Sequence, residues 1–244
     1  MGEEPNTKVA RLEVENARLR AEMHSLRQAL EREDEVAAVN EVRLRLAYFS
    51  TIQALVQAIE AKDPYTIGHS QMVAKIAVAL ARRLELTDDE CERVRIAGLL
   101  LDVGKIGISG EILTKKEGLT AAERQVLETH VEIGAQIVEP IIYPWDVSTL
   151  VYQHHERLDG SGYPARLRGA DIAFEARILG LADAFVAMIV RRAYREAHGE
   201  PQALAYFRSE AGRTFDASCV EALAAVLESE SELRDEIDRF KASI

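Results

Sequence analysis

Four of the six histidines in this 244-residue sequence stand in short contexts rich in aspartate and glycine. They are His69, His130, His154 and His155. Asp102 and Asp183 lie at the ends of apolar helical runs, where a carboxylate is costly to bury unless its charge is compensated. One buried metal centre explains these six side chains together, although each histidine alone would more often be an ordinary structural residue. Mixed His and Asp donors suit iron, manganese or zinc better than magnesium.

His154 and His155 are adjacent, so on an intact helix their side chains would point about 100° apart. Both reach one metal centre only if the helix end is unwound or tilted. The segment that follows, Glu156 to Pro164, contains two glycines and a proline. We therefore expect a break after the helix and a loop beside the ligand pocket, although a plain turn has the same composition.

The stretch GLLLDVGKIG at 98–107 places an acid and a lysine three residues apart at the end of an apolar run. Asp102 is a candidate metal ligand and Lys105 a candidate phosphate anchor. Leu101 stands where a second ligand is expected, and its side chain offers no lone pair.

Four motifs together resemble the HD-GYP family, a subgroup of the HD-domain metal-dependent phosphohydrolases. They are HHERLDGSGYP at 154–164, DPYTIGH at 63–69, DVGK at 102–105 and ADAF at 182–185. The family's characteristic substrate is the bacterial second messenger cyclic di-GMP. The resemblance covers roughly residues 45–228 and implies an all-α, HD-type helical bundle with one or two divalent metal ions per chain, usually iron or manganese.

The resemblance also implies roles for individual residues. The first metal ion is assigned to His69, Asp102 and Asp183, and Asp102 bridges to a second ion held by His130, His154 and His155. Lys105 steadies the scissile phosphate, Gly162, Tyr163 and Pro164 form the signature loop, and Arg192 and Arg195 lie near the phosphates of the substrate. In such a centre two metal ions activate water for attack on phosphorus, while Lys105 offsets the growing negative charge.

Leu101 replaces the histidine that gives the HD pair its name. Val186 and Arg191 stand where the family usually has aspartate, Ala193 where it has proline, and Lys116-Glu117 where it has Pro-Gly. Because three protein ligands can suffice for a catalytic metal, Leu101 predicts weaker metal occupancy rather than certain inactivity.

Three functions follow from these departures. The first is a signalling protein that binds metal and cyclic di-GMP with weak or lost phosphodiesterase activity. The second is an active phosphodiesterase that gives pGpG or GMP. The third is a scaffold that presents the GYP loop to other signalling proteins.

Residues 9–30 follow a heptad repeat that indicates a coiled coil. Position a is taken by Val9, Asn16, Met23 and Leu30, and position d by Leu12, Leu19 and Leu26. Glu15 and Glu22 at position g oppose Arg20 and Arg27 at position e, which favours a parallel homodimer. A lone amphipathic helix packed on its own domain is the alternative.

We expect a coiled coil and helical connector over 1–45, an HD-GYP domain over 46–228 and a charged helix over 229–244. Apolar periodicity predicts helices at 69–84, 88–103, 121–138, 145–156, 175–190, 201–211 and 217–228, with at most a small hairpin. The net charge of −11 argues against DNA or RNA polymers as partners. No apolar run has the length of a membrane span, so we expect a cytoplasmic protein with two free cysteines.

Overall fold

The computed structural model describes residues 5–62, 67–115, 117–141, 146–190 and 198–243. Within these ranges the protein is helical and has no strand, which confirms the predicted all-α class. The one isolated bridge, between Ala211 and Phe215, takes the place of the small hairpin. In the part of the chain that the structure describes, no helix is both long and apolar enough to cross a membrane.

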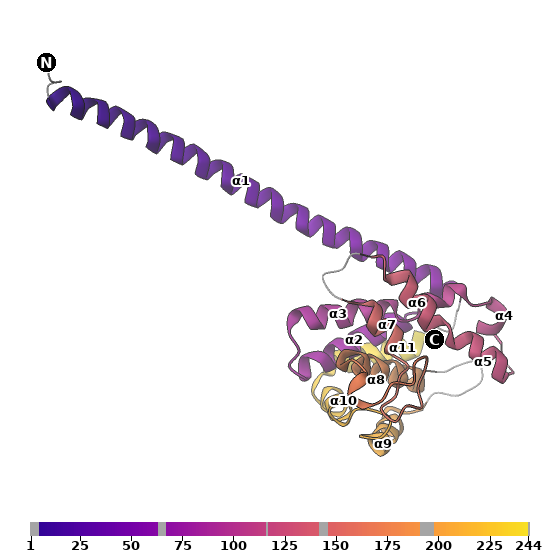
Figure 1. The fold of residues 1–244 in the computed structure, drawn as a ribbon. Coiled ribbons are helices and arrows are strands. Elements are labelled where there is room, and N and C mark those ends of the chain that lie inside the picture. The colour runs from indigo at the N-terminus through magenta and orange to yellow at the C-terminus, as the bar shows by residue number, and fades with distance from the viewer. Residues whose placement is uncertain (1–4, 63–66, 116, 142–145, 191–197, 244) are drawn as a thin grey trace. The chain divides into compact units, whose positions relative to one another are not determined.

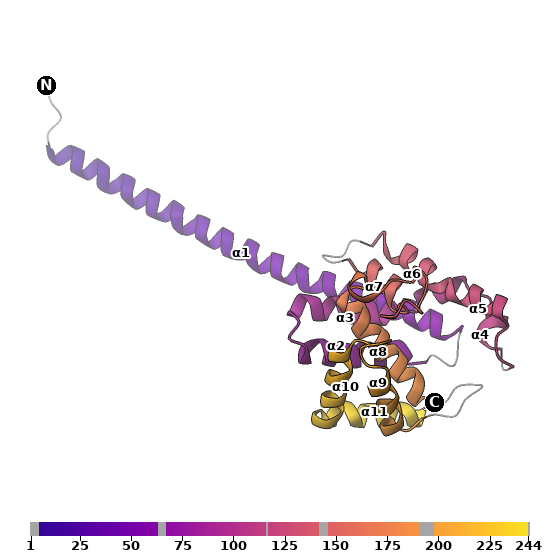
Figure 2. The ribbon, with the colours of Figure 1, turned by 60° about the horizontal axis from the view of Figure 1, so that its bottom comes forward.

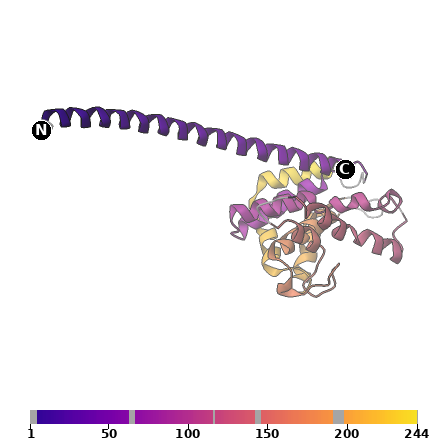
Figure 3. The same ribbon diagram turned by 45° about the horizontal axis from the view of Figure 1, so that its top comes forward.

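The chain divides into two compact units, Met1–Thr51 and Ile52–Ile244. Helix α1 (Pro5–Glu60) is one uninterrupted helix (Figure 3). Its final turns belong to the second unit, where Ile52, Val56 and Ile59 are buried.

The apolar heptad side chains that the structure describes in the first unit are exposed. The side chains of Val9, Leu19, Met23, Leu26 and Leu30 are each more than half exposed. The side chain of Leu12 lies outside the described residues.

The second unit is a bundle centred on α8 (Phe174–Ile189), as Figure 2 shows. Helix α8 packs against α2 (His69–Arg83), α3 (Asp88–Leu100), α7 (Ser148–Gln153), α9 (Glu200–Glu210) and α10 (Ala217–Ser229). Helix α6 (His130–Val138) packs on α7 and on the 3-10 helix η2 (Val103–Gly107). The bundle is completed by α4 (Gly110–Leu113), α5 (Ala121–Glu128), η3 (Gly169–Asp171) and α11 (Ser231–Ser243).

Three predicted helices are longer than the observed ones. In each case a predicted metal ligand lies where the observed helix ends or breaks. The helix predicted over 88–103 ends at Leu100. The helix predicted over 121–138 breaks at Thr129 into α5 and α6, and the helix predicted over 145–156 covers 148–153. Apolar periodicity continues across such breaks because both flanking helices bury the same face, so periodicity alone does not reveal them.

Helices α2 and α3 pack closely against each other. A Cβ atom added at Gly98 would lie 2.8 Å from the Cα atom of Ala74, well inside van der Waals contact. This glycine lets α3 approach α2 closely, two residues before α3 ends at Leu100.

We predict that Gly98→Ala destabilises the protein by about 1–3 kcal/mol, because the added methyl group forces α2 and α3 apart. Gly110→Ala is the matched control, since a Cβ atom there meets nothing within 4 Å. Its effect is expected to stay within about 1 kcal/mol. Urea unfolding followed by circular dichroism measures both, and equal effects of the two substitutions would contradict the close-packing argument.

Candidate metal centre

His130 and His154 are held in the same way, each by the helix end that precedes it. His130 follows α5, and its Nδ1 donates to the carbonyl oxygen of Leu127 at 2.7 Å. His154 follows α7, and its Nδ1 donates to the carbonyl oxygen of Val151 at 2.7 Å. The last carbonyls of a helix lack partners within it, so they are ready acceptors for a following side chain. Because a carbonyl only accepts, Nδ1 carries the proton and Nε2 carries the lone pair in both rings.

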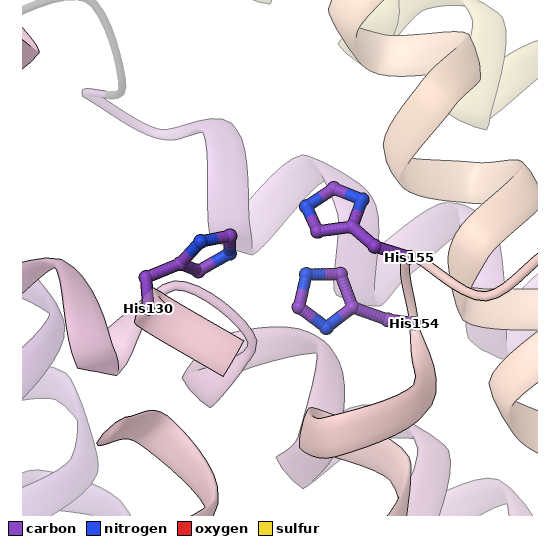
Figure 4. Close-up of side chains that lie close together, drawn as sticks. All are labelled: His130, His154 and His155. Carbon is purple, nitrogen blue, oxygen red and sulfur yellow. The ribbon is translucent and has the colours of Figure 1, made fainter. Parts of the chain in front are cut away.

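The three histidines His130, His154 and His155 point toward one another (Figure 4). Each offers a ring nitrogen, and these atoms all lie within 4.8 Å of one another. Helix α7 ends at Gln153, so the break begins before His154 and His155 rather than at Glu156 as the sequence predicted. The break allows two adjacent side chains to reach one centre.

Asp102 and Lys105 lie on one side of this cluster. Asp102 follows α3 and precedes η2, and its Oδ2 accepts from the Nζ of Lys105 at 2.9 Å. Its other oxygen, Oδ1, lies 3.7 Å from the Nε2 of His130. Gly104 makes this approach possible, because a Cβ atom there would lie 1.8 Å from the carbonyl oxygen of His130.

Asp183 and His69 lie on the other side. The Nε2 of His69, the first residue of α2, donates to Oδ1 of Asp183 on α8 at 2.9 Å. The second oxygen of Asp183 lies 3.9 Å from Nδ1 of His155. The structure thus brings all six predicted metal ligands and Lys105 into one continuous chain of contacts.

Burial and the neighbouring charges set the protonation of the site. Burial disfavours the charge of Asp102, but Lys105 and His130 outweigh it and lower the pKa of Asp102 to about 2. Burial also disfavours charge on Asp183, but the hydrogen bond from His69 and the nearby His155 hold the pKa of Asp183 well below its usual value. Both carboxylates are therefore anionic at neutral pH.

The clustered histidines are neutral at the same pH. Burial, reinforced by His130, lowers the pKa of His154 to about 4. Burial and the adjacent His154 hold the pKa of His155 well below its usual value. Burial also lowers the pKa of His130, although the charge of Asp102 opposes this shift. Neutral imidazole is the form that binds metal.

The residues fit a divalent cation. Among the described residues, the Nε2 atoms of His130 and His154 are buried and have no hydrogen-bond partner. A buried polar atom without a partner is costly, and here two such lone pairs face the same gap as His155. Since Nδ1 of each ring is already bonded to a carbonyl, the arrangement is the one found around metal-bound histidines.

Leu101 is completely buried, next to Asp102 at the end of α3. Val186, the second replaced position, is also completely buried, in α8. Both apolar side chains therefore belong to the core of the bundle. Arg191, the third replaced position, lies outside the described residues, as do Ala193 and Lys116.

The signature loop covers the histidines from one side. The ring of Tyr163 lies 4.7 Å from the ring of His155, tilted by 33°. Gly162 is buried, and its backbone passes close to the carbonyl oxygen of His155. Pro164, at the end of the motif, is half-buried. The predicted phosphate-binding residues Arg192 and Arg195 lie outside the described residues.

Three residues near the site did not emerge as candidates from the sequence. Glu156 is buried, and its carboxylate accepts from the backbone amides of Ala165 and Leu167, which directly follow the signature loop. Arg157 donates to the carbonyl oxygens of His154 and Glu156. Glu60 accepts from the amide of Gly68, directly before His69. For Glu156 and Arg157 the sequence signal was their place in the HHER run at 154–157. They were not singled out because acidic and basic residues in loops are usually solvated.

The comparisons with known proteins agree with this geometry. The family model described as HD domain matches residues 53–219. A cyclic di-GMP phosphodiesterase response regulator, RpfG of Xanthomonas campestris, is 38% identical over 84% of this chain and 55% of its own length. The 3'3'-cGAMP-specific phosphodiesterase 3 of Vibrio cholerae is 35% identical over 72% of this chain and 38% of its own length. The chain thus spans about half the length, or less, of these two relatives.

Solved structures support the same fold. The cyclic GMP-AMP specific phosphodiesterase V-cGAP3 of V. cholerae aligns with a TM-score of 0.59 at 19% identity, over 78% of this chain and 52% of that one. The HDG"Y"P protein Bd1817 of Bdellovibrio bacteriovorus aligns with a TM-score of 0.55 at 21% identity, over 66% of this chain and 52% of that one.

The helical bundle brings buried histidines and aspartates into one cluster, with His130 and His154 at helix ends and Asp183 inside α8 rather than at the end of a helical run. The three clustered histidines could hold a metal ion. The chain belongs to the HD domain family, and its HHE-to-GYP block identifies it as an HD-GYP member, as the sequence predicted.

We predict that the metal-free protein loses stability as the pH falls from about 6.5 to about 4. The unfolded chain binds a proton at His154 in this range and the folded chain does not, so the free energy of unfolding falls by about 1.4 kcal/mol per pH unit for this residue. Urea unfolding in chelator at several pH values measures the slope. His154→Gln should flatten it, whereas His24→Gln on the exposed face of α1 should not. Equal slopes in all three proteins would contradict the assignment.

Proposed function

We propose that this chain is a cyclic-dinucleotide signalling protein that binds one or two divalent metal ions, with phosphodiesterase activity weakened by Leu101. The observation that carries the proposal is the pair of buried, unpartnered Nε2 atoms on His130 and His154, which face His155. The relatives support the ligand class, because those described above are named as cyclic di-GMP or cGAMP phosphodiesterases. Cyclic di-GMP is the ligand we propose first.

The six predicted metal ligands form two groups that differ in the number of donor atoms they offer a metal ion. His130, His154 and His155, with Asp102, supply four donors for one ion, and their neutral rings and anionic carboxylate need no proton to be removed at pH 7. The other end has only His69 and Asp183 besides the shared Asp102, because Leu101 has no donor atom. We therefore propose one well-formed site and one weakened site, with iron or manganese as occupant.

The chain's own residues prepare the site for a phosphodiester. Lys105 places a positive charge beside Asp102, where it would offset the charge on a phosphoryl oxygen. Burial of the histidines excludes bulk water from one side of the centre. A bound metal ion would supply a water of lowered pKa as nucleophile and would polarise the phosphoryl oxygens.

An active phosphodiesterase that gives pGpG or GMP is the second candidate function. It is favoured by the intact pair of Asp102 and Lys105 and by the three converging histidines. A scaffold that engages signalling proteins through the GYP loop becomes the leading function only if pure protein binds neither metal nor cyclic dinucleotide. Elemental analysis of anaerobically purified protein, with cyclic di-GMP turnover measured on the same sample, separates the three.

Restoring the missing ligand tests the proposal directly. We predict that Leu101→His raises the metal content by up to one ion per chain and raises cyclic di-GMP turnover at least tenfold, because it supplies the donor that the weakened site lacks. Leu100→His is the matched control, since it places a histidine at the neighbouring buried position. It should raise neither quantity. A gain in the control equal to that of Leu101→His, or no gain in either protein, would contradict the proposed defect.

We also propose a homodimer through a parallel coiled coil of residues 9–30, which continues through the connector into the HD-GYP domain. The exposed apolar heptad side chains need a partner, and their single asparagine, Asn16, is also exposed and would pair with its copy. The charges at positions e and g complement one another in the same register.

We predict that Leu19→Asp with Leu26→Asp converts a dimer to a monomer, because each dimer would then bury four carboxylates in the coiled-coil seam. Sedimentation equilibrium measures the mass. The control pair Arg18→Asp with Gln28→Asp changes exposed residues outside positions a and d and should leave the dimer intact. A monomeric parent protein would instead favour the lone helix.

A further inference from the structure

Glu156 joins the histidine pair to the signature loop. Only 5% of this residue is exposed, and it directly follows His155. Its Oε1 accepts from the amide of Ala165 at 2.7 Å and its Oε2 accepts from the amide of Leu167 at 2.9 Å. Each carboxylate oxygen therefore holds one of two loop amides that lie on either side of Arg166.

Arg166 has a backbone conformation that an arginine rarely adopts. Its φ is +54°, in the left-handed region, where a side chain crowds the backbone. Residues held in such conformations persist only where surrounding contacts impose them, and such strain gathers at ligand-binding sites. The two bonds to Glu156 bracket this residue and impose its conformation.

The loop held in this way lies directly on the cluster. The amide of Tyr163 donates to the carbonyl oxygen of His155 at 3.3 Å, and the two rings lie 4.7 Å apart. A Cβ atom at Gly162 would lie 2.4 Å from the same carbonyl oxygen, so the loop has no room to move closer. Arg157 donates to the carbonyl oxygens of His154 at 3.1 Å and Glu156 at 2.8 Å.

We propose that Glu156 is a positioning residue, whose carboxylate clamps the loop amides of Ala165 and Leu167 and thereby holds Tyr163 over His155. This inference rests on the proposed function, since it assigns the clamped loop to the binding of the cyclic dinucleotide. We assign Glu156 no contact with substrate or metal, because both of its carboxylate oxygens accept from loop amides. Its action is on the backbone of the loop.

Glu156→Gln tests the clamp with almost no change of shape. The amide oxygen of glutamine accepts from one loop amide, but its NH2 group faces the other amide with a donor, so one of the two bonds is lost. We expect amide hydrogen exchange in a peptide covering 160–168 to accelerate at least tenfold, while exchange in α8 stays unchanged. We also expect the Kd for cyclic di-GMP to rise at least tenfold at an unchanged metal content.

Arg166→Gly supplies a rescue that a merely structural role would not predict. Glycine adopts a positive φ without help, so in the double variant of Glu156→Gln and Arg166→Gly the loop should recover most of its protection and its affinity. Asp171→Asn is the control for loss of one negative charge at an exposed position nearby. It should leave both measurements unchanged.

Three outcomes would overturn the proposal. They are unchanged loop exchange in Glu156→Gln, a loss of metal that parallels the loss of nucleotide affinity, and an absence of rescue by Arg166→Gly. If the parent protein binds no cyclic dinucleotide, the proposed function fails, while the exchange measurements still decide whether Glu156 holds the loop.

Discussion

The structure depends on two hydrogen bonds from buried imidazoles to the carbonyl oxygens of the helix ends before them. The bonds from His130 to Leu127 and from His154 to Val151 satisfy one nitrogen of each ring and fix its tautomer. The second nitrogen is then a buried lone pair without a partner among the described residues. Helices α5 and α7 end next to His130 and His154, and this is where the two lone pairs face each other. The ends of these helices therefore place the two candidate ligands.

The carboxylates complete the charge balance of the site. Asp102 and Asp183 remain anionic although they are buried. The charge of Lys105 stabilises the Asp102 carboxylate, and the hydrogen bond from His69 stabilises the Asp183 carboxylate. The three clustered histidines contribute no charge at neutral pH, because burial keeps them unprotonated. A site with two anions, neutral rings and one lysine is suited to accept a further positive charge.

Leu101 contributes to the packing of the bundle but offers no donor atom to a metal ion. A leucine at the end of α3 packs into the core and leaves the bundle intact, because its neighbours in the helix are also apolar and buried. In the proposed assignment, this leucine supplies no donor atom to the metal ion held by His69, Asp102 and Asp183. At this position the bundle is therefore stabilised by apolar packing.

The sequence by itself determined the helical class, the HD-GYP membership and the break after α7, because periodicity, glycines and the HHE-to-GYP block are local patterns. Only the tertiary structure decided how His130 meets His154, since the break at Thr129 interrupts a continuous apolar pattern. It also decided the contacts of Glu156, whose partners lie nine and eleven residues away in a folded-back loop. From sequence alone, a carboxylate in a loop is expected to be solvated. Glu156 can hold the loop only because the tertiary structure buries it and brings the amides of Ala165 and Leu167 to it.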